Sequence, residues 1–286
     1  MAKLIIPLFL TMLVMASCSQ EPTEVHQQAE QVEPVYYREL SVTELQKLAE
    51  QGDPAGQLHL GTRYFFGEGV PQDYEEAVPW LKASAEQGNP SAQAMLGVAY
   101  SSGEGVPQDQ AEGMRWYRLA AEQGSVVGQD RLGVAHYHGG GVPQDYAEAV
   151  KWFRMAAEQG YPTSQFNLGV KYDRGEGVPQ DYAEAVRWFR MAAEQGHADA
   201  QFNLGFSYKE GRGVPQDDVQ AHKWYNLGSV SEVSDPARES SRESRITVRD
   251  DLEENMTREQ IAEAQRLATE WKPKEWEVIR QELGIE

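Results

Sequence analysis

The chain has 286 residues, and its 45 aspartates and glutamates against 26 lysines and arginines give a formal net charge of −19. This excess of acid argues against nucleic acid as a partner, because phosphate backbones attract positive charge, and against direct binding to anionic membranes. The single cysteine, Cys18, excludes a disulfide framework and a thiolate metal site.

The first residues predict a secretion signal. Lys3 supplies a short positive segment, residues 4–15 form an apolar run, and the small residues Ala16 and Ser17 precede Cys18. The apolar run is shorter than the roughly 20 residues that span a bilayer. We therefore predict a signal peptide over residues 1–17.

The end of this run, Val14 to Cys18, resembles the lipobox of bacterial lipoproteins, although Met15 replaces the usual leucine. The resemblance implies acylation of Cys18, and Ser19 after it implies an outer-membrane lipoprotein facing the periplasm. The alternative is ordinary cleavage near Cys18, which would leave a soluble periplasmic or extracellular protein. Residues 18–40 are rich in Gln, Glu and Pro and predict a disordered tether.

An amphipathic helix over Val42 to Gln51 is expected next, as an N-terminal cap covering residues 41–52. From residue 53 to 232 a pattern repeats every 36 residues without insertion or deletion, which is the signature of a repeat architecture. Three motifs stay in register through all five units. They are Leu-Gly at 60/61, 96/97, 132/133, 168/169 and 204/205, Val-Pro-Gln-Asp beginning at 70, 106, 142, 178 and 214, and tryptophan at 80, 116, 152, 188 and 224.

Each unit predicts two helices. In the fourth unit the first helix runs from Pro162 to about Arg174, where glycines end it. The second begins at Asp181, and Glu184 three residues later predicts a reciprocal capping box. Gly196 ends that helix.

The pattern Ala-Gln-x-x-Leu-Gly-x-x-Tyr-x-x-Gly-x-Gly-Val, followed by Asp-x-x-x-Ala-x-x-Trp and Ala-Ala-Glu-x-Gly, resembles the Sel-one-like repeat family, a relative of the tetratricopeptide repeats. The resemblance implies an all-α fold, a right-handed α-solenoid of helix-turn-helix repeats that acts as an adaptor or scaffold. Local departures are His136 in place of Tyr, Pro79 inside a second helix, and Glu232 in place of the closing glycine.

The fixed positions of each first helix, such as Gln57, Leu60 and Gly61, share one side and predict the core. The tryptophans are predicted to fill the gaps between stacked helix pairs. The opposite side of the first helices varies between units, and the resemblance implies that it lines a concave groove. The candidate partner-binding residues on that side are His59, Arg63, Phe66, Met95, Arg131, His138, Phe166, Asn167, Lys171, Arg174, Phe202, Asn203 and Phe206.

Residues 233–286 predict C-terminal capping helices, because a terminal repeat would otherwise expose an apolar face. One helix is expected from Pro236 to about Met256, a second after Thr257, and a third from Pro273. Trp271 and Trp276 are expected to pack in this cap, and a docking surface formed by the two tryptophans is the alternative.

No pattern of catalytic residues, cofactor-binding loop or metal-ligand set stands out. The pair His136 and His138 has a spacing that points the two side chains about 200° apart on a helix, which disfavours a shared ion. A cysteine-rich branch of the family is linked to penicillin binding and hydrolysis, but this chain lacks those cysteines. We therefore expect no enzyme activity and no cofactor.

The predicted function is a protein-interaction scaffold in the bacterial cell envelope. A secreted or surface-exposed effector that binds a host protein is the alternative, and an envelope hydrolase ranks third. Contact with a membrane is expected only through a lipid on Cys18.

Overall fold

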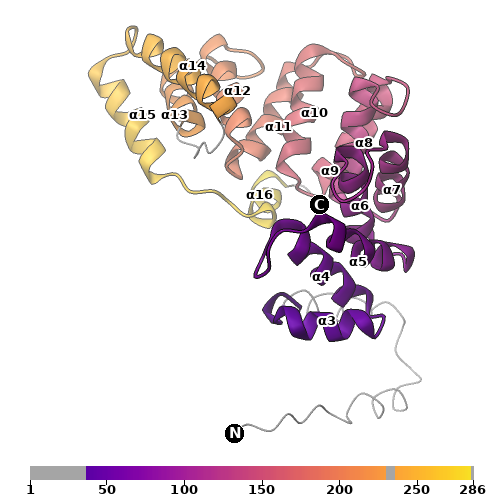
Figure 1. Ribbon diagram of the computed structural model, residues 1–286. Helices are drawn as coiled ribbons and strands as arrows, with labels where there is room; N and C mark the ends of the chain where they lie inside the picture. The colour runs from indigo at the N-terminus through magenta and orange to yellow at the C-terminus, as the bar shows by residue number, and fades with distance from the viewer. Residues whose placement is uncertain (1–36, 230–235, 285–286) are drawn as a thin grey trace, which may run out of the picture. The chain divides into compact units, whose positions relative to one another are not determined.

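The computed structural model describes residues 37–229 and 236–284, which are helical with short connections and contain no strand (Figure 1). Consecutive helices pack in pairs, which confirms the predicted α-solenoid of helical repeats. The predicted signal peptide, Cys18, residues 18–36 of the predicted tether and Glu232 lie outside the described residues.

The helix boundaries agree closely with those predicted. Helix α3 spans Val42–Glu50. The first helices of the five units are α4 (Pro54–Phe66), α6 (Pro90–Ser102), α8 (Val126–His138), α10 (Pro162–Arg174) and α12 (Ala198–Glu210). The second helices are α5 (Tyr74–Glu86), α7 (Gln110–Glu122), α9 (Tyr146–Glu158), α11 (Tyr182–Glu194) and α13 (Asp218–Ser229). Three further helices follow, α14 (Pro236–Glu253), α15 (Arg258–Glu270) and α16 (Trp276–Leu283).

The chain divides between Ser84 and Ala85 into two compact units. In the N-terminal one, Leu45 and Ala49 of α3 form a core with Leu60 of α4. Ser84 donates a hydrogen bond to the carbonyl of Pro54 at 2.7 Å, which joins α5 to the start of α4. The C-terminal unit holds the remaining repeats and α14 to α16.

The glycine of each Leu-Gly pair receives a large side chain from the second helix of the same repeat. A β-carbon on Gly133 would lie 2.6 Å from the Phe153 ring, and one on Gly169 would lie 2.7 Å from the Phe189 ring. The equivalent residues, each directly after a repeat tryptophan, are Leu81, Tyr117, Phe153, Phe189 and Tyr225, and all are at most 3% exposed. The glycine therefore forms a notch for this ring.

The tryptophans themselves are less uniform than predicted. Trp116, Trp188 and Trp224 are buried, whereas Trp80 and Trp152 are partly exposed. The tryptophan was predicted to fill the gap between stacked helix pairs, but the residue after it occupies the deepest position. The reason is the helical angle, since neighbouring residues point about 100° apart and only one can enter the notch.

The Val-Pro-Gln-Asp motif closes the turn between the two helices of a repeat. In the fourth repeat, Gln180 donates to the carbonyl of Asp173 at 2.7 Å, and the backbone N–H of Asp181 donates to the carbonyl of Tyr172 at 2.9 Å. The Asp181 carboxylate then accepts from the N–H of Glu184 at 3.0 Å. Because the Asp181 N–H is already used, Glu184 pairs with Arg187 instead of reaching back. The predicted capping box is therefore only half formed here.

A buried glutamine in each first helix links neighbouring repeats. Gln165 is fully buried and donates to the carbonyl of Ala157 in the preceding repeat at 3.1 Å. Its own oxygen accepts from Gln195, at the end of the second helix of the same repeat, at 2.8 Å. The pairs Gln123 with Gln93 and Gln159 with Gln129 repeat the arrangement. This ladder gives a second hydrogen bond to backbone carbonyls at the helix ends, such as that of Ala157, which also accepts from the N–H of Gly160 at 3.0 Å.

The C-terminal helices do not act together as a cap. Helices α14 and α15 pack against α13, where the buried His222 contacts Glu253 at 2.6 Å. Helix α16 begins at Trp276 rather than Pro273, and it lies away from the last repeat. Its Ile279 is buried among residues of α9, α10 and α11, beside which α16 appears in Figure 1.

Candidate partner-binding cleft on the first helices

The predicted binding residues differ widely in exposure. Phe66, Arg131, His138, Arg174 and Phe206 are exposed. Those that are only partly exposed are His59, Arg63, Met95, Phe166, Asn167, Phe202 and Asn203. Lys171 is buried, with 3% of its surface exposed. The candidate partner-binding residues are therefore not all accessible to a partner.

In the N-terminal unit, two predicted binding residues instead hold the residues that precede α3. The His59 ring stacks on Tyr37 at 5.4 Å, and the Arg63 guanidinium donates to the Arg38 carbonyl at 2.9 Å. Burial lowers the pKa of His59, which keeps the imidazole neutral. Leu40 packs against the same core. Residues 37–40 are thus ordered by α4, and the predicted disordered tether does not extend through them.

In the fourth and fifth repeats, the aromatic residues among the predicted binding residues contribute to packing between helices. Phe166 stacks on His197 at 5.0 Å, and Phe202 lies 5.1 Å from Tyr225. Arg245 of α14 covers Phe202 from the other side, at 5.5 Å. These contacts leave Phe206, 37% exposed, as the most accessible aromatic residue of α12.

Lys171 is part of an internal cluster rather than a surface. Its ammonium lies 3.2 Å from the centre of the Tyr137 ring and 2.7 Å from the Glu176 carboxylate. Burial opposes ionisation of Glu176, but the bond from Lys171 prevails and lowers the pKa of this carboxyl group. The expectation that Lys171 faces a partner is therefore not supported by its position, because cation–π contact and ion pairing fix it within the protein.

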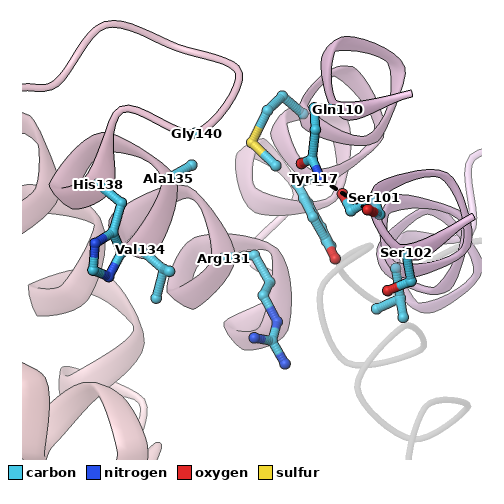
Figure 2. Close-up of a pocket in the computed structure, with 11 residues that line it drawn as sticks. Ser101, Ser102, Gln110, Tyr117, Arg131, Val134, Ala135, His138 and Gly140 are labelled. Carbon is cyan, nitrogen blue, oxygen red and sulfur yellow. Dashed lines mark hydrogen bonds between the residues drawn. The ribbon is translucent and has the colours of Figure 1, made fainter. Parts of the chain in front are cut away.

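One repeat earlier, the equivalent space is open and forms a cleft of about 280 Å³. Figure 2 shows Arg131, Val134 and His138 of α8 on one side of it, and Ser101 and Tyr117 across the cleft. The residues that line it are Val98, Ser101, Ser102, Gln110, Met114, Tyr117, Arg131, Val134, Ala135, His138 and Gly140.

The cleft exists because small residues replace the internal cluster. Counted by the 36-residue period, Ser101 stands at the position of Tyr137, Ala135 at that of Lys171, and Gly140 at that of Glu176. Gln110 likewise stands where two later repeats have Tyr146 and Tyr182. These exchanges were visible in the sequence as departures from the repeat. Of the residues that line the cleft, however, the list of candidate partner-binding residues included only Arg131 and His138.

The cleft combines an apolar floor with polar and basic groups at its edge. Met114, Val98 and Val134 supply apolar surface, and burial raises the pKa of the Tyr117 phenol, which keeps it protonated. Arg131 and His138 are exposed, and neither forms an ion pair within the described part of the chain. Such a site fits an apolar side chain of a partner with a carboxylate nearby.

Behind Arg131, the buried Asp130 links two repeats. Its carboxylate accepts from Ser164 at 2.7 Å and also from the amide of Asn167, which accounts for the partial burial of that predicted binding residue. Burial raises the pKa of Asp130, although the bond from Ser164 opposes this effect. Because the folded-state pKa is above that of the unfolded chain, the associated stability is present at low pH and is lost as the pH rises through the folded-state pKa.

We therefore expect Asp130→Asn to be more stable than the wild type at pH 8. The difference should shrink as the pH falls toward about 4, where aspartate in the unfolded chain also becomes protonated. Urea titrations across this range measure it, with Glu122→Gln as a control that removes an exposed charge. A difference that does not depend on pH would contradict the assignment of Asp130.

Within the described residues, no group of three or more His, Cys, Asp or Glu side chains is placed to hold a metal ion. His136 is buried and His138 is exposed, as expected for a core position beside a surface one. None of the helices in residues 37–229 and 236–284 has the length and apolar content needed to cross a bilayer.

Comparisons with known proteins agree with the repeat architecture. The family model of the Sel1 repeat matches residues 54–89, 90–125, 126–161, 162–197 and 198–229, which together make up more than half of the chain. No curated protein matches the sequence.

Two solved structures are similar to the chain. A Sel1 repeat protein from Oxalobacter formigenes has 38% sequence identity and a TM-score of 0.63, and the match covers 68% of this chain and 57% of that one. A protective antigen present in uropathogenic Escherichia coli strains, which displays an SLR fold, has 31% identity and a TM-score of 0.64, with 88% and 64% covered. The chain therefore spans less than two thirds of the length of either structure.

Proposed function

Because the chain belongs to the Sel1 repeat family, whose members generally mediate protein–protein interactions, we propose that it is a scaffold of the bacterial cell envelope that binds a partner protein at the cleft between α6, α7 and α8. The observation that carries the proposal is the cleft itself. A space that is filled by Tyr137, Lys171 and Glu176 at the next junction is open here, with Arg131 and His138 at its edge.

The chemistry of the cleft defines the partner segment. Its floor fits an apolar side chain, and the basic edge favours an aspartate or glutamate beside that side chain. In a chain of net charge −19, Arg131 and His138 form a local basic site that can attract such a segment.

The double variant Arg131→Glu with His138→Glu tests this site. Both side chains are exposed, so helical circular dichroism should not change, while the affinity for a partner captured by crosslinking should fall at least tenfold, about 1.4 kcal/mol. Raising the salt concentration should also weaken wild-type binding, because exposed charges are screened.

Arg258→Glu on α15 is the control, since it reverses an exposed charge far along the sequence from the cleft. Equal loss of capture in both variants would mean that net charge, not the cleft, controls binding. The identity of the captured protein separates the envelope scaffold from the alternative of a secreted effector, for which a host protein is expected.

The envelope location rests on the N-terminal sequence, in which Cys18 follows an apolar run and small residues. A fatty-acid probe fed to cells should label the wild-type protein and not Cys18→Ser. An unlabelled wild type, or a labelled Cys18→Ser, would remove the lipid anchor and leave ordinary secretion.

A further inference from the structure

The C-terminal segment of the chain docks on the second helices of the third, fourth and fifth repeats. Trp271 packs near Gly196 and lies 6.3 Å from Trp224, and its indole N–H donates to the Glu194 carboxylate at 3.3 Å. The backbone N–H of Lys274 donates to the carbonyl of Glu194 at 2.8 Å. Residues between α15 and α16 are therefore held as an extended strap.

Trp276 repeats this arrangement one repeat earlier. It packs directly against Gly160, and it lies beside Glu158 and Trp188. Each tryptophan thus lies in an equivalent position. This position is formed by the Glu-Gln-Gly sequence at the end of one second helix and by the tryptophan of the next second helix along the chain. We name this position a corner, after its glycine. Trp276 covers the Gly160 corner, whereas Trp271 and Pro273 border the Gly196 corner, whose glycine stays exposed.

Two further corners in the C-terminal unit are open. Within residues 37–229 and 236–284, no atom would lie within 4 Å of a β-carbon on Gly124 or on Gly88, whereas Gly160 is covered by the Trp276 ring. The tryptophans of these open corners are Trp152 and Trp116.

Apolar side chains are likewise buried at the covered Gly160 corner and exposed at the open corners. Met191, beside Trp188, is 0% exposed and belongs to the cluster that contains Ile279 of α16. Its equivalents in the open corners are Met155, 43% exposed, and Leu119, 38% exposed. These are among the few large apolar side chains that the described surface leaves exposed, and they continue the surface that the strap covers.

Charge also distinguishes the strap from the rest of the chain. Lys272 and Lys274 lie between its two tryptophans, and the Lys274 ammonium is 3.7 Å from the Glu194 carboxylate. At the open Gly124 corner the equivalent acid is Glu122, which is exposed. The open Gly124 corner therefore offers the same combination of apolar surface and carboxylate that holds the strap.

From this repetition we infer that the Gly124 and Gly88 corners bind a partner protein through a segment that resembles the strap, with two large aromatic side chains five residues apart and lysines between them. The expected orientation of the partner segment follows from that of the strap, because the first tryptophan of the strap lies one repeat nearer the C-terminus than its second. The partner's first aromatic residue would enter the Gly124 corner beside Met155, and its second would enter the Gly88 corner beside Leu119. This surface lies on the second helices and shares no lining residue with the proposed cleft between α6, α7 and α8.

A separate partner is a better occupant than the strap of a second copy. The chain's own strap is tethered to its corners, and a short tether corresponds to an effective concentration in the millimolar range. A second copy would have to release its strap before sharing it. A free segment present at micromolar concentration would instead fill the open corners first.

The test uses a fluorescent peptide with the sequence of residues 269–284 and measures its binding to the full chain by polarisation. The peptide should bind the wild type, and the double variant Leu119→Glu with Met155→Glu should bind it at least tenfold more weakly. A peptide with alanine in place of both tryptophans should bind weakly to either protein. Both substituted positions are exposed, so the circular dichroism spectrum should not change.

Phe206→Glu, which replaces another exposed large apolar side chain, is the matched control and should leave peptide affinity within twofold. Arg131→Glu should also leave it unchanged, so this result is independent of the first-helix cleft. The inference is overturned if the wild type does not bind the peptide, or if the Leu119 and Met155 variant binds it equally well. It is also overturned if sedimentation shows a wild-type dimer that this variant abolishes, because the occupant would then be a second copy.

Discussion

Replacing Phe153 by alanine is expected to destabilise the C-terminal unit by about 3–5 kcal/mol, the usual cost of removing a buried aromatic ring. Phe153 is 2% exposed and fills the notch that Gly133 leaves in α8. It also contacts the cluster around Leu168 and Trp188. The cavity would lie between helices that are held on several sides, so little relaxation is expected.

Denaturant titration of the C-terminal unit measures this effect. Met155→Ala, two residues along the same helix, is the control, because Met155 is 43% exposed and its loss should change stability by no more than about 1 kcal/mol. Similar losses for both variants would contradict the notch as the centre of packing.

Replacing Gln165 by alanine is expected to cost about 2–4 kcal/mol, although glutamine is an ordinary surface residue in most helices. Gln165 is fully buried, and its amide bonds both the carbonyl of Ala157 and the side chain of Gln195. The variant removes both of these bonds, although the Ala157 carbonyl keeps the N–H of Gly160 as a partner. A hydrogen bond within a protein contributes about 0.5–1.5 kcal/mol, and the packing of the buried side chain is lost in addition.

Gln195→Ala separates the two parts of this effect. It removes only the outer member of the ladder and leaves Gln165 bonded to Ala157, so a loss of about 1 kcal/mol is expected. Because the two residues contact each other, the double variant should be less destabilised than the sum of the single variants. Additive losses would show that the two amides do not act together.

The repeat pattern by itself determined the fold. Motifs that recur every 36 residues placed the helices of all five repeats, and local signals such as Pro162 and Gly175 marked where a helix begins and ends. These features depend on backbone preferences and on helix periodicity, which act over a few residues and can be read from a single chain. The core side of the first helices was predicted for the same reason.

Tertiary structure alone decided which variable residues a partner can reach. Lys171 and Arg131 both stand on the variable side of a first helix, yet one is buried under Tyr137 and the other is exposed at a cleft. The difference arises from residues a full repeat away, since Gly140 takes the place of Glu176. A helical pattern carries no information about such contacts between repeats.

The C-terminal segment shows the same limit most clearly. Sequence signals predicted α14, α15 and a last helix, and apolar residues such as Trp276 and Ile279 indicated that the last helix packs on something. Helix periodicity indicates that the apolar face of a helix must be covered, but it does not indicate which surface of the protein covers that face. The end of the last repeat and the corners of the middle repeats are both apolar, and only the path of the chain after α15 places α16 on α9 and α11.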